Sequence, residues 1–246
     1  MEMKKTIAYI LIAGTLCSCN GFLTKDPTNS IPGDKFMRTE SDVILYSNGM
    51  LNSYVPSFSE ISGSTDETSD ICATKSGSDY LQPGIWSASR QGGWAAGDWT
   101  FVRRANYWIE NLPKAEDALS AEKYRHYMGE ARFWRAYAHF NKVRLFGDIP
   151  WIDHVVGSDE TETLNAPRDD RGFVMDKVME DFDKAIANLP EARNITRVNK
   201  WSALAFKSRA ALYEGSWRLY RGLPDAQKYL ELAADAASKV MSCQQY

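Results

Sequence analysis

The stretch that decides the fold is Gly129–Trp151, GEARFWRAYAHFNKVRLFGDIPW. Its apolar side chains recur at helical spacing on two faces, which predicts a helix buried between neighbours rather than one lying on a surface. One stripe consists of Tyr127, Ala131, Trp134 and Ala138, and the other of Phe133, Tyr137, Phe140 and Arg144. Gly147 suits a left-handed C-cap, and Pro150 prevents the helix from resuming.

Similar apolar stripes occur on both sides of this helix, within 43–54, 99–112, 175–189, 201–215 and 229–240. Thr39 is a suitable N-cap for the first of them, Pro113 ends the second, and Pro224 suits the N1 position of the last. The deciding helix itself begins near Ser120. No strand-like alternation of useful length appears. The predicted fold class is therefore all-α, with tetratricopeptide-like stacked helix pairs and a long irregular loop insertion.

The insertion is Pro56–Gly97, where the helical periodicity disappears. It is rich in Ser, Gly, Asp and Thr, yet it contains Tyr80, Trp86 and Trp94. Disordered tracts seldom carry so many large aromatic side chains, and ordered loops of this length are usually functional. We therefore expect recognition to take place here.

Composition excludes several classes of protein. Hydrophobic residues make up 44% of the 246 residues and charged residues 25%, so the chain can form a packed core. The net charge is -3 and no long basic run occurs, so we expect no nucleic-acid partner. The three histidines have no metal-ligand spacing and no glycine-rich phosphate loop is present, so we expect no metal and no cofactor.

The N-terminus predicts an export route. Its apolar run, Ile7–Leu16, follows two lysines and is too short to span a bilayer, which is typical of a secretory signal. The next residues place a leucine three positions before Cys19 and a serine just before it, as in the lipobox of bacterial lipoproteins. We expect a lipoprotein signal peptide over 1–18, lipidation at Cys19, a linker over 19–35 and a helical domain over 36–246. The alternative is an ordinary signal peptide whose cysteines are incidental.

Charged residues within the deciding helix raise the question of catalysis. Glu130, Arg132 and Arg135 have no accompanying nucleophile or second acid, and buried Glu–Arg pairs between stacked helices are ordinary structural devices. We interpret them as scaffold. Asp66, Glu67 and Asp70 offer a carboxylate pair for glycoside hydrolysis, but solvated loop charge is the favoured interpretation.

Tryptophans are the more informative candidates for binding. Sugar rings have apolar faces and polar edges, so their sites combine flat aromatic platforms with carboxylate, amide or guanidinium groups. The candidate ligand-binding residues are Asp66, Glu67, Trp86, Trp94, Trp99 and Asn106, with Arg90 nearby in sequence. The alternative for each tryptophan is a place in the core, and for Trp99, which lies on an apolar stripe, we favour that alternative.

The deciding stretch resembles the characteristic helix of the SusD/RagB lipoproteins. The matching residues are Glu130, Ala131, Arg132, Phe133, Arg135, Ala136, Tyr137, Phe140, Val143, Phe146, Gly147 and Pro150. Supporting matches follow in order, and they are the lipidated start Cys19–Leu23, the segment Trp99–Pro113 with its Arg-Ala-Asn triplet, Met179–Pro190 and Arg197–Trp217.

The resemblance implies a non-enzymatic lipoprotein on the surface of the outer membrane of a Bacteroidetes-type bacterium. Such proteins bind a glycan and cover a SusC-type TonB-dependent transporter, to which they deliver the nutrient. Family members are commonly about twice this length, so the chain is expected to correspond to their N-terminal half, with the C-terminal half missing. Three alternatives stay open, and they are a transporter-associated scaffold without a ligand site, a peptide-binding member, and a glycosidase using the Asp66 cluster.

Overall fold

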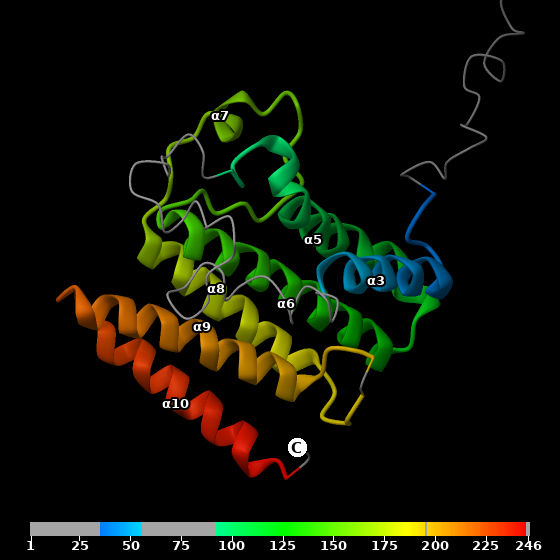
Figure 1. Ribbon diagram of the computed structural model, residues 1–246. Coiled ribbons are helices and arrows are strands. Elements are labelled where there is room, and N and C mark those ends of the chain that lie inside the picture. Colours follow the sequence, from blue (N-terminus) through cyan, green and yellow to red (C-terminus); the bar gives the residue numbers. More distant parts are fainter. Residues whose placement is uncertain (1–34, 56–91, 195, 245–246) are drawn as a thin grey trace, which may run out of the picture. The chain divides into compact units, whose positions relative to one another are not determined.

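The computed structural model describes residues 35–55, 92–194 and 196–244 (Figure 1). The chain divides into two units, Met1–Phe36 and Met37–Tyr246, and all the helices below belong to the second. They are α3 (Glu40–Tyr54), η3 (Ala96–Trp99), α5 (Thr100–Asn111), η4 (Leu112–Ala118), α6 (Ala121–Phe146), α7 (Thr161–Leu164), α8 (Arg171–Asn188), α9 (Lys200–Tyr220) and α10 (Ala226–Ser242). Within the described ranges no strand occurs, and one isolated bridge joins Ile149 to Asp169. The all-α prediction is confirmed.

The four long helices α6, α8, α9 and α10 form one antiparallel series in which each packs against the next (Figure 1). The helix α5 packs on the opposite side of α6, and α3 contacts α6 as well. Consecutive helices therefore pair as in tetratricopeptide-like proteins. The deciding stretch lies at the centre of the series, so apolar side chains on both its faces are buried, as the double stripe predicted. Among the buried residues are Ala131, Phe133, Ala136, Ala138 and Phe140.

Local sequence explains the helix boundaries. Thr39 accepts a hydrogen bond from the Asp42 amide while the Asp42 carboxylate accepts one from the Thr39 amide, which is a capping box. The Ser120 side chain caps α6 by accepting a hydrogen bond from the Lys123 amide. Gly147 ends α6 at a φ of 74°, a left-handed conformation that glycine adopts without strain.

Two boundaries differ from the expectation. The α-helix α5 ends at Asn111, but the chain continues through Pro113 as the 3-10 helix η4, because a proline near the start of a helix has no amide to leave unpaired. Asp225, at a φ of 62°, is the N-cap of α10. Pro224 thus lies before the helix and does not occupy its N1 position.

Glycines allow close approach at two contacts in the helical series. A Cβ atom on Gly129 of α6 would lie 2.9 Å from Leu189 Cγ at the end of α8. A Cβ atom on Gly215 of α9 would lie 2.8 Å from Leu230 of α10. Any larger residue would push these helices apart, since packed interiors have little free space.

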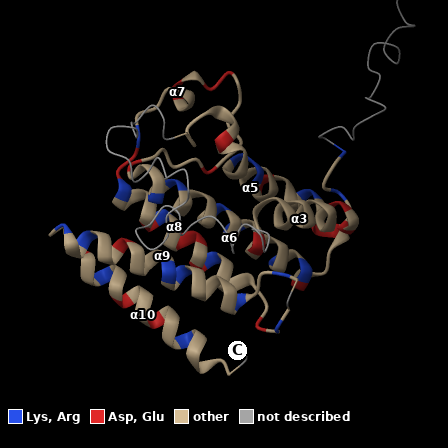
Figure 2. Ribbon diagram, in the orientation of Figure 1, with Lys and Arg blue, Asp and Glu red and all other residues tan. Residues whose placement is uncertain are grey.

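Buried charges tie α6 to its neighbours. The Arg135 guanidinium donates to both carboxylate oxygens of Asp181 in α8, at 2.6 and 2.9 Å, and Asp181 is 1% exposed. Glu130, fully buried, accepts a 2.5 Å hydrogen bond from Ser47 of α3 and contacts Arg197 at 3.5 Å. These residues are engaged in inter-helix pairs, which agrees with their interpretation as scaffold. Elsewhere each of α8, α9 and α10 carries both basic and acidic residues (Figure 2).

We predict that Asp181→Asn lowers the free energy of unfolding by roughly 3–5 kcal/mol, because it leaves the Arg135 guanidinium buried without a counter-charge. The matched control is Asp235→Asn, which removes the exposed ion pair with Lys239 and should cost under about 0.5 kcal/mol. Urea unfolding followed by circular dichroism measures both. Equal losses for the two variants would contradict the role given to Asp181.

Candidate functional site

A cleft of about 480 Å³ opens beside the first turn of α5. One side comes from Trp94, Ala96 and the start of α5, and the other from the segment between α6 and α8. We call it the Trp94 cleft. Its lining residues are Trp94, Ala96, Trp99, Thr100, Val102, Arg103, Pro150, Ile152, His154, Val156, Thr163, Leu164, Ala166 and Arg168.

Two of the predicted tryptophans meet in this cleft. The rings of Trp94 and Trp99 lie edge to face, with centroids 5.3 Å apart and planes at 87°. Phe146, at the end of α6, packs against Trp94 at 4.8 Å. Trp94 is 37% exposed, so part of its ring is open to solvent. Trp99 is half-buried and lines the cleft, because it stands at the N-cap of α5 rather than within its buried stripe.

Cationic groups surround this aromatic pair. The Arg168 guanidinium lies 4.3 Å from the centre of the Trp94 ring. The Lys142 ammonium lies 5.0 Å from the Trp99 ring and donates a 2.5 Å hydrogen bond to the Gly93 carbonyl. The latter bond fixes the backbone next to Trp94, which holds the exposed ring in place.

Asn106 lies in the protein interior, not at the surface of the cleft where a ligand could contact it. It is fully buried, and its amide nitrogen donates to the carbonyls of Ile152 and His154, both at 2.9 Å. Its side-chain oxygen accepts from Arg135 at 3.3 Å. Because the side chain is enclosed and its hydrogen bonds are used inside the protein, Asn106 supports the far wall of the cleft without facing it.

That far wall, residues 150–157, contains no regular secondary structure and is anchored by side chains. Arg135 donates to the Asp153 carbonyl at 2.9 Å, and Arg103 donates to the Val156 carbonyl at 2.6 Å. The Glu110 carboxylate accepts from the Val155 amide at 2.6 Å. Helices α5 and α6 thereby fix an irregular segment through hydrogen bonds to its backbone groups. We call residues 150–157 the wall segment.

His139 contacts the wall segment and His154 belongs to it, and the two rings lie in opposite electrostatic environments. His139 is fully buried, donates through Nδ1 to the Arg135 carbonyl and accepts from the Ile152 amide through Nε2. Burial lowers the pKa of His139 to about 4, so the ring is neutral at neutral pH. His154 lines the cleft, where its hydrogen bond with Glu160, at 2.8 Å, raises the pKa of the ring above its ordinary value.

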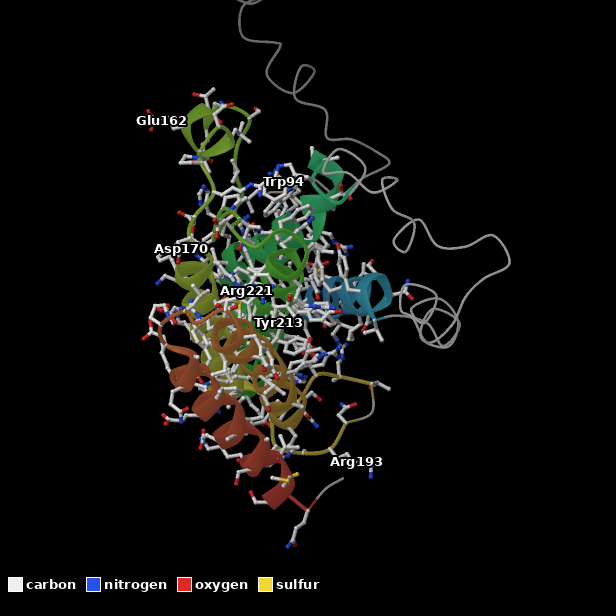
Figure 3. The ribbon with its side chains drawn as sticks, turned by 60° about the vertical axis from the view of Figure 1, so that its left-hand side comes forward. Trp94, Glu162, Asp170, Arg193, Tyr213 and Arg221 are labelled. Atoms are coloured by element: carbon white, nitrogen blue, oxygen red, sulfur yellow. The ribbon has the colours of Figure 1, made fainter. Side chains whose placement is uncertain are left out.

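The predicted residues thus have separate outcomes. Trp94 and Trp99 lie together in the cleft, and Asn106 supports its wall. Asp66, Glu67, Trp86 and the lipidation residue Cys19 lie outside the described residues. Figure 3 shows Trp94 and Glu162 of α7 toward one end of the helical unit and Arg193 toward the other.

Sequence reasoning missed Arg103, His154 and Arg168. Arg103 directly precedes the Arg-Ala-Asn triplet, so that motif offered a signal for it. His154 and Arg168 come from a segment without periodicity, and only the folded structure brings them to the tryptophans.

This arrangement is suited to binding a ring-containing ligand that carries hydroxyl groups. Flat aromatic surface takes up apolar ring faces, and guanidinium groups donate to hydroxyl oxygens at their edges. Within the residues that the structure describes, no group of His, Cys, Asp or Glu is arranged to hold a metal ion. A search of the same residues finds no helix of the length and apolarity needed to cross a membrane.

Comparison with known proteins identifies similar sequences over most of the chain. A SusD-like family model, described as "Starch-binding associating with outer membrane", matches residues 64–212. SusD-like protein P2 of Formosa agariphila is 28% identical over 245 residues, covering 94% of this chain and 46% of the relative. SusD-like protein P25 of the same organism is 25% identical over 238 residues, covering 89% and 44%. The chain therefore spans less than half the length of these relatives.

Solved structures share the fold. A SusD-like protein from Bacteroides fragilis superimposes with a TM-score of 0.61 at 20% identity, covering 90% of this chain and 42% of that one. A protein described as a laminarin binding SusD-like protein gives a TM-score of 0.58 at 20% identity, covering 83% and 44%. At such identities the likeness concerns the helical architecture alone.

We predict that the pKa of His154 lies above the ordinary histidine value of 6.5 and that the pKa of His139 lies below it. In an NMR titration His154 should titrate above pH 6.5, and Glu160→Gln should move it back toward that value. His139 should stay neutral down to about pH 4. Between pH 6.5 and about 4 the unfolded chain therefore binds a proton at His139 that the folded chain does not bind. Lowering the pH through this range reduces the free energy of unfolding by up to about 3 kcal/mol. A His139 resonance titrating near pH 6.5 would contradict the burial argument.

Proposed function

Because this chain belongs to the SusD-like family, described as starch-binding and associated with the outer membrane, we propose that the Trp94 cleft binds a carbohydrate chain. We further propose that the protein is a non-catalytic lipoprotein, anchored through Cys19 at the cell surface. It would pass captured oligosaccharide to a SusC-type TonB-dependent transporter.

The observation that carries the proposal is the crossed pair of Trp94 and Trp99 in an open cleft with guanidinium groups at its edge. The two ring planes are nearly perpendicular, so together they offer a face and an edge to adjacent sugar units. Arg168 covers part of Trp94 and brings donors to the same place. Because the buried Asn106 and Arg135 hold the far wall, the cleft is formed before the ligand arrives, which lowers the entropic cost of binding.

Binding without hydrolysis is favoured by the residues in the cleft. Glycoside hydrolysis ordinarily needs two carboxylates flanking the scissile bond. The described residues that line the cleft include the titratable side chains Arg103, His154 and Arg168 but neither Asp nor Glu. The nearby carboxylate of Glu160 accepts hydrogen bonds from His154 and from the Gly157 amide, which holds the loop together.

We predict that Trp94→Ala lowers affinity for a bound oligosaccharide at least tenfold, because truncating a tryptophan that anchors a binding surface commonly costs more than about 1.4 kcal/mol of binding free energy. The melting temperature should change little, because Trp94 is 37% exposed. Isothermal titration with malto-, laminari- and xylo-oligosaccharides measures the affinity. Trp201→Ala is the matched control, a half-buried tryptophan that lines no part of the cleft.

The outcomes separate the alternatives. A large fall in melting temperature with unchanged affinity would mean that Trp94 belongs to the core. Absence of glycan binding by the unmodified chain would favour a transporter-associated scaffold, and binding of peptides instead would favour a peptide-binding member. Release of reducing ends from a polysaccharide would replace the non-catalytic function by that of a glycosidase.

A further inference from the structure

A second cavity, of about 670 Å³, lies where the end of α6, the start of α8 and the end of α9 meet. We call it the Arg171 cavity. Residues that line it include Asp148, Asp170, Arg171, Phe173, Trp217 and Tyr229. None of them lines the Trp94 cleft. Asp170 and Arg221, which stacks on Trp217 at 3.3 Å, lie on the same side of the helical unit in Figure 3.

The two cavities share a rim. Its backbone consists of 146–150 and 168–171, joined by the bridge between Ile149 and Asp169, with the Asp169 amide 3.1 Å from the Ile149 carbonyl. Pro150 and Arg168 line the Trp94 cleft, whereas their near neighbours Asp148 and Asp170 line the Arg171 cavity. The cavities thus lie on either side of these two bridged backbone segments.

An aromatic side chain crosses the rim. Phe146 lines the Arg171 cavity, and its ring packs against Trp94 of the neighbouring cleft at 4.8 Å. Apolar surface therefore continues from one cavity to the other. A chain-like ligand that rests on Trp94 has Phe146 as its next contact in that direction.

The Arg171 cavity contains a buried donor without an acceptor. Arg171 is 8% exposed, and its Nε donates to the Glu214 carboxylate at 2.7 Å. Its Nη2 is buried and has no hydrogen-bond partner within the described part of the chain. Leaving a buried donor without a hydrogen bond costs roughly 1–3 kcal/mol. We therefore expect an oxygen atom of a ligand or of an ordered water to accept from it.

Charges in the cavity disfavour an anionic ligand. The single carboxylate of Glu214 accepts from both Arg171 and Arg218. Asp148, Asp170, Asp176 and Asp225 also line the cavity, so with Glu214 five carboxylates stand against two guanidinium groups and an anion would be repelled. Closely spaced donors and acceptors next to aromatic rings match the alternating hydroxyl groups and apolar faces of a sugar.

We propose that the Trp94 cleft and the Arg171 cavity are two subsites of one extended carbohydrate-binding surface that crosses the Ile149–Asp169 bridge. This inference rests on the proposed function and adds to it a preference for long chains. A long oligosaccharide occupies both subsites. Once one end is bound, the other end is held near the second subsite at a high effective concentration, which raises the affinity. A short one fills the Trp94 cleft alone.

The test is isothermal titration of the whole chain with disaccharide, tetrasaccharide and octasaccharide members of the malto and laminari series. We expect octasaccharide affinity to exceed tetrasaccharide affinity about tenfold. Phe173→Ala should remove this gain and leave tetrasaccharide affinity unchanged, because Phe173 lines the second subsite and is 46% exposed. Leu212→Ala is the matched control, removing a side chain of similar exposure on α9 that lines neither cavity.

Equal affinities for tetrasaccharide and octasaccharide, with no effect of Phe173→Ala, would overturn the extended surface and leave the Trp94 cleft standing. An octasaccharide gain that survives Phe173→Ala would also overturn it, since the gain would then arise elsewhere. Failure of every oligosaccharide to bind would overturn the proposed function as well.

Discussion

The Arg135 guanidinium is the group on which the other features depend. It lies 4% exposed within α6 and donates to Asp181 of α8, to Asn106 of α5 and to the Asp153 carbonyl of the wall segment. A buried cation is stable only when its hydrogen bonds and its charge are both satisfied, and Arg135 meets that requirement through three separate parts of the chain. Those parts are therefore held in one fixed arrangement.

This arrangement explains how a regular stack of helices produces an irregular cleft at its surface. Helix packing buries the apolar stripes and leaves little variety of shape at the surface. The wall segment supplies that variety, and its backbone is fixed by buried polar groups of α5 and α6. Asn106 illustrates the division, because an amide predicted to touch ligand instead holds the carbonyls of Ile152 and His154. In the proposed function, Trp94, Trp99 and the guanidinium groups around them contact the ligand.

Physical reasons separate what could be predicted from sequence from what could not. Local sequence patterns predict the double apolar stripe of α6, the N-cap at Thr39 and the C-cap at Gly147, because each depends only on residues a few positions apart. The pairing of Trp94 with Trp99 was also within reach, since they are close in sequence. His154 and Arg168 reach the cleft only because the chain turns back at the Ile149–Asp169 bridge. The burial of Asn106 depends in the same way on Arg135, a residue of another helix.

Hydrogen–deuterium exchange of an Asn106→Ala variant tests the central claim, that buried polar groups of α5 and α6 hold the wall of the Trp94 cleft. Loss of two hydrogen bonds to the wall should speed exchange of the Val155 and Gly157 amides at least tenfold, because local opening becomes easier. Amides within α8 and α9 should exchange at unchanged rates. Unaltered exchange across residues 150–157 would contradict the account, since the wall would then be fixed without Asn106.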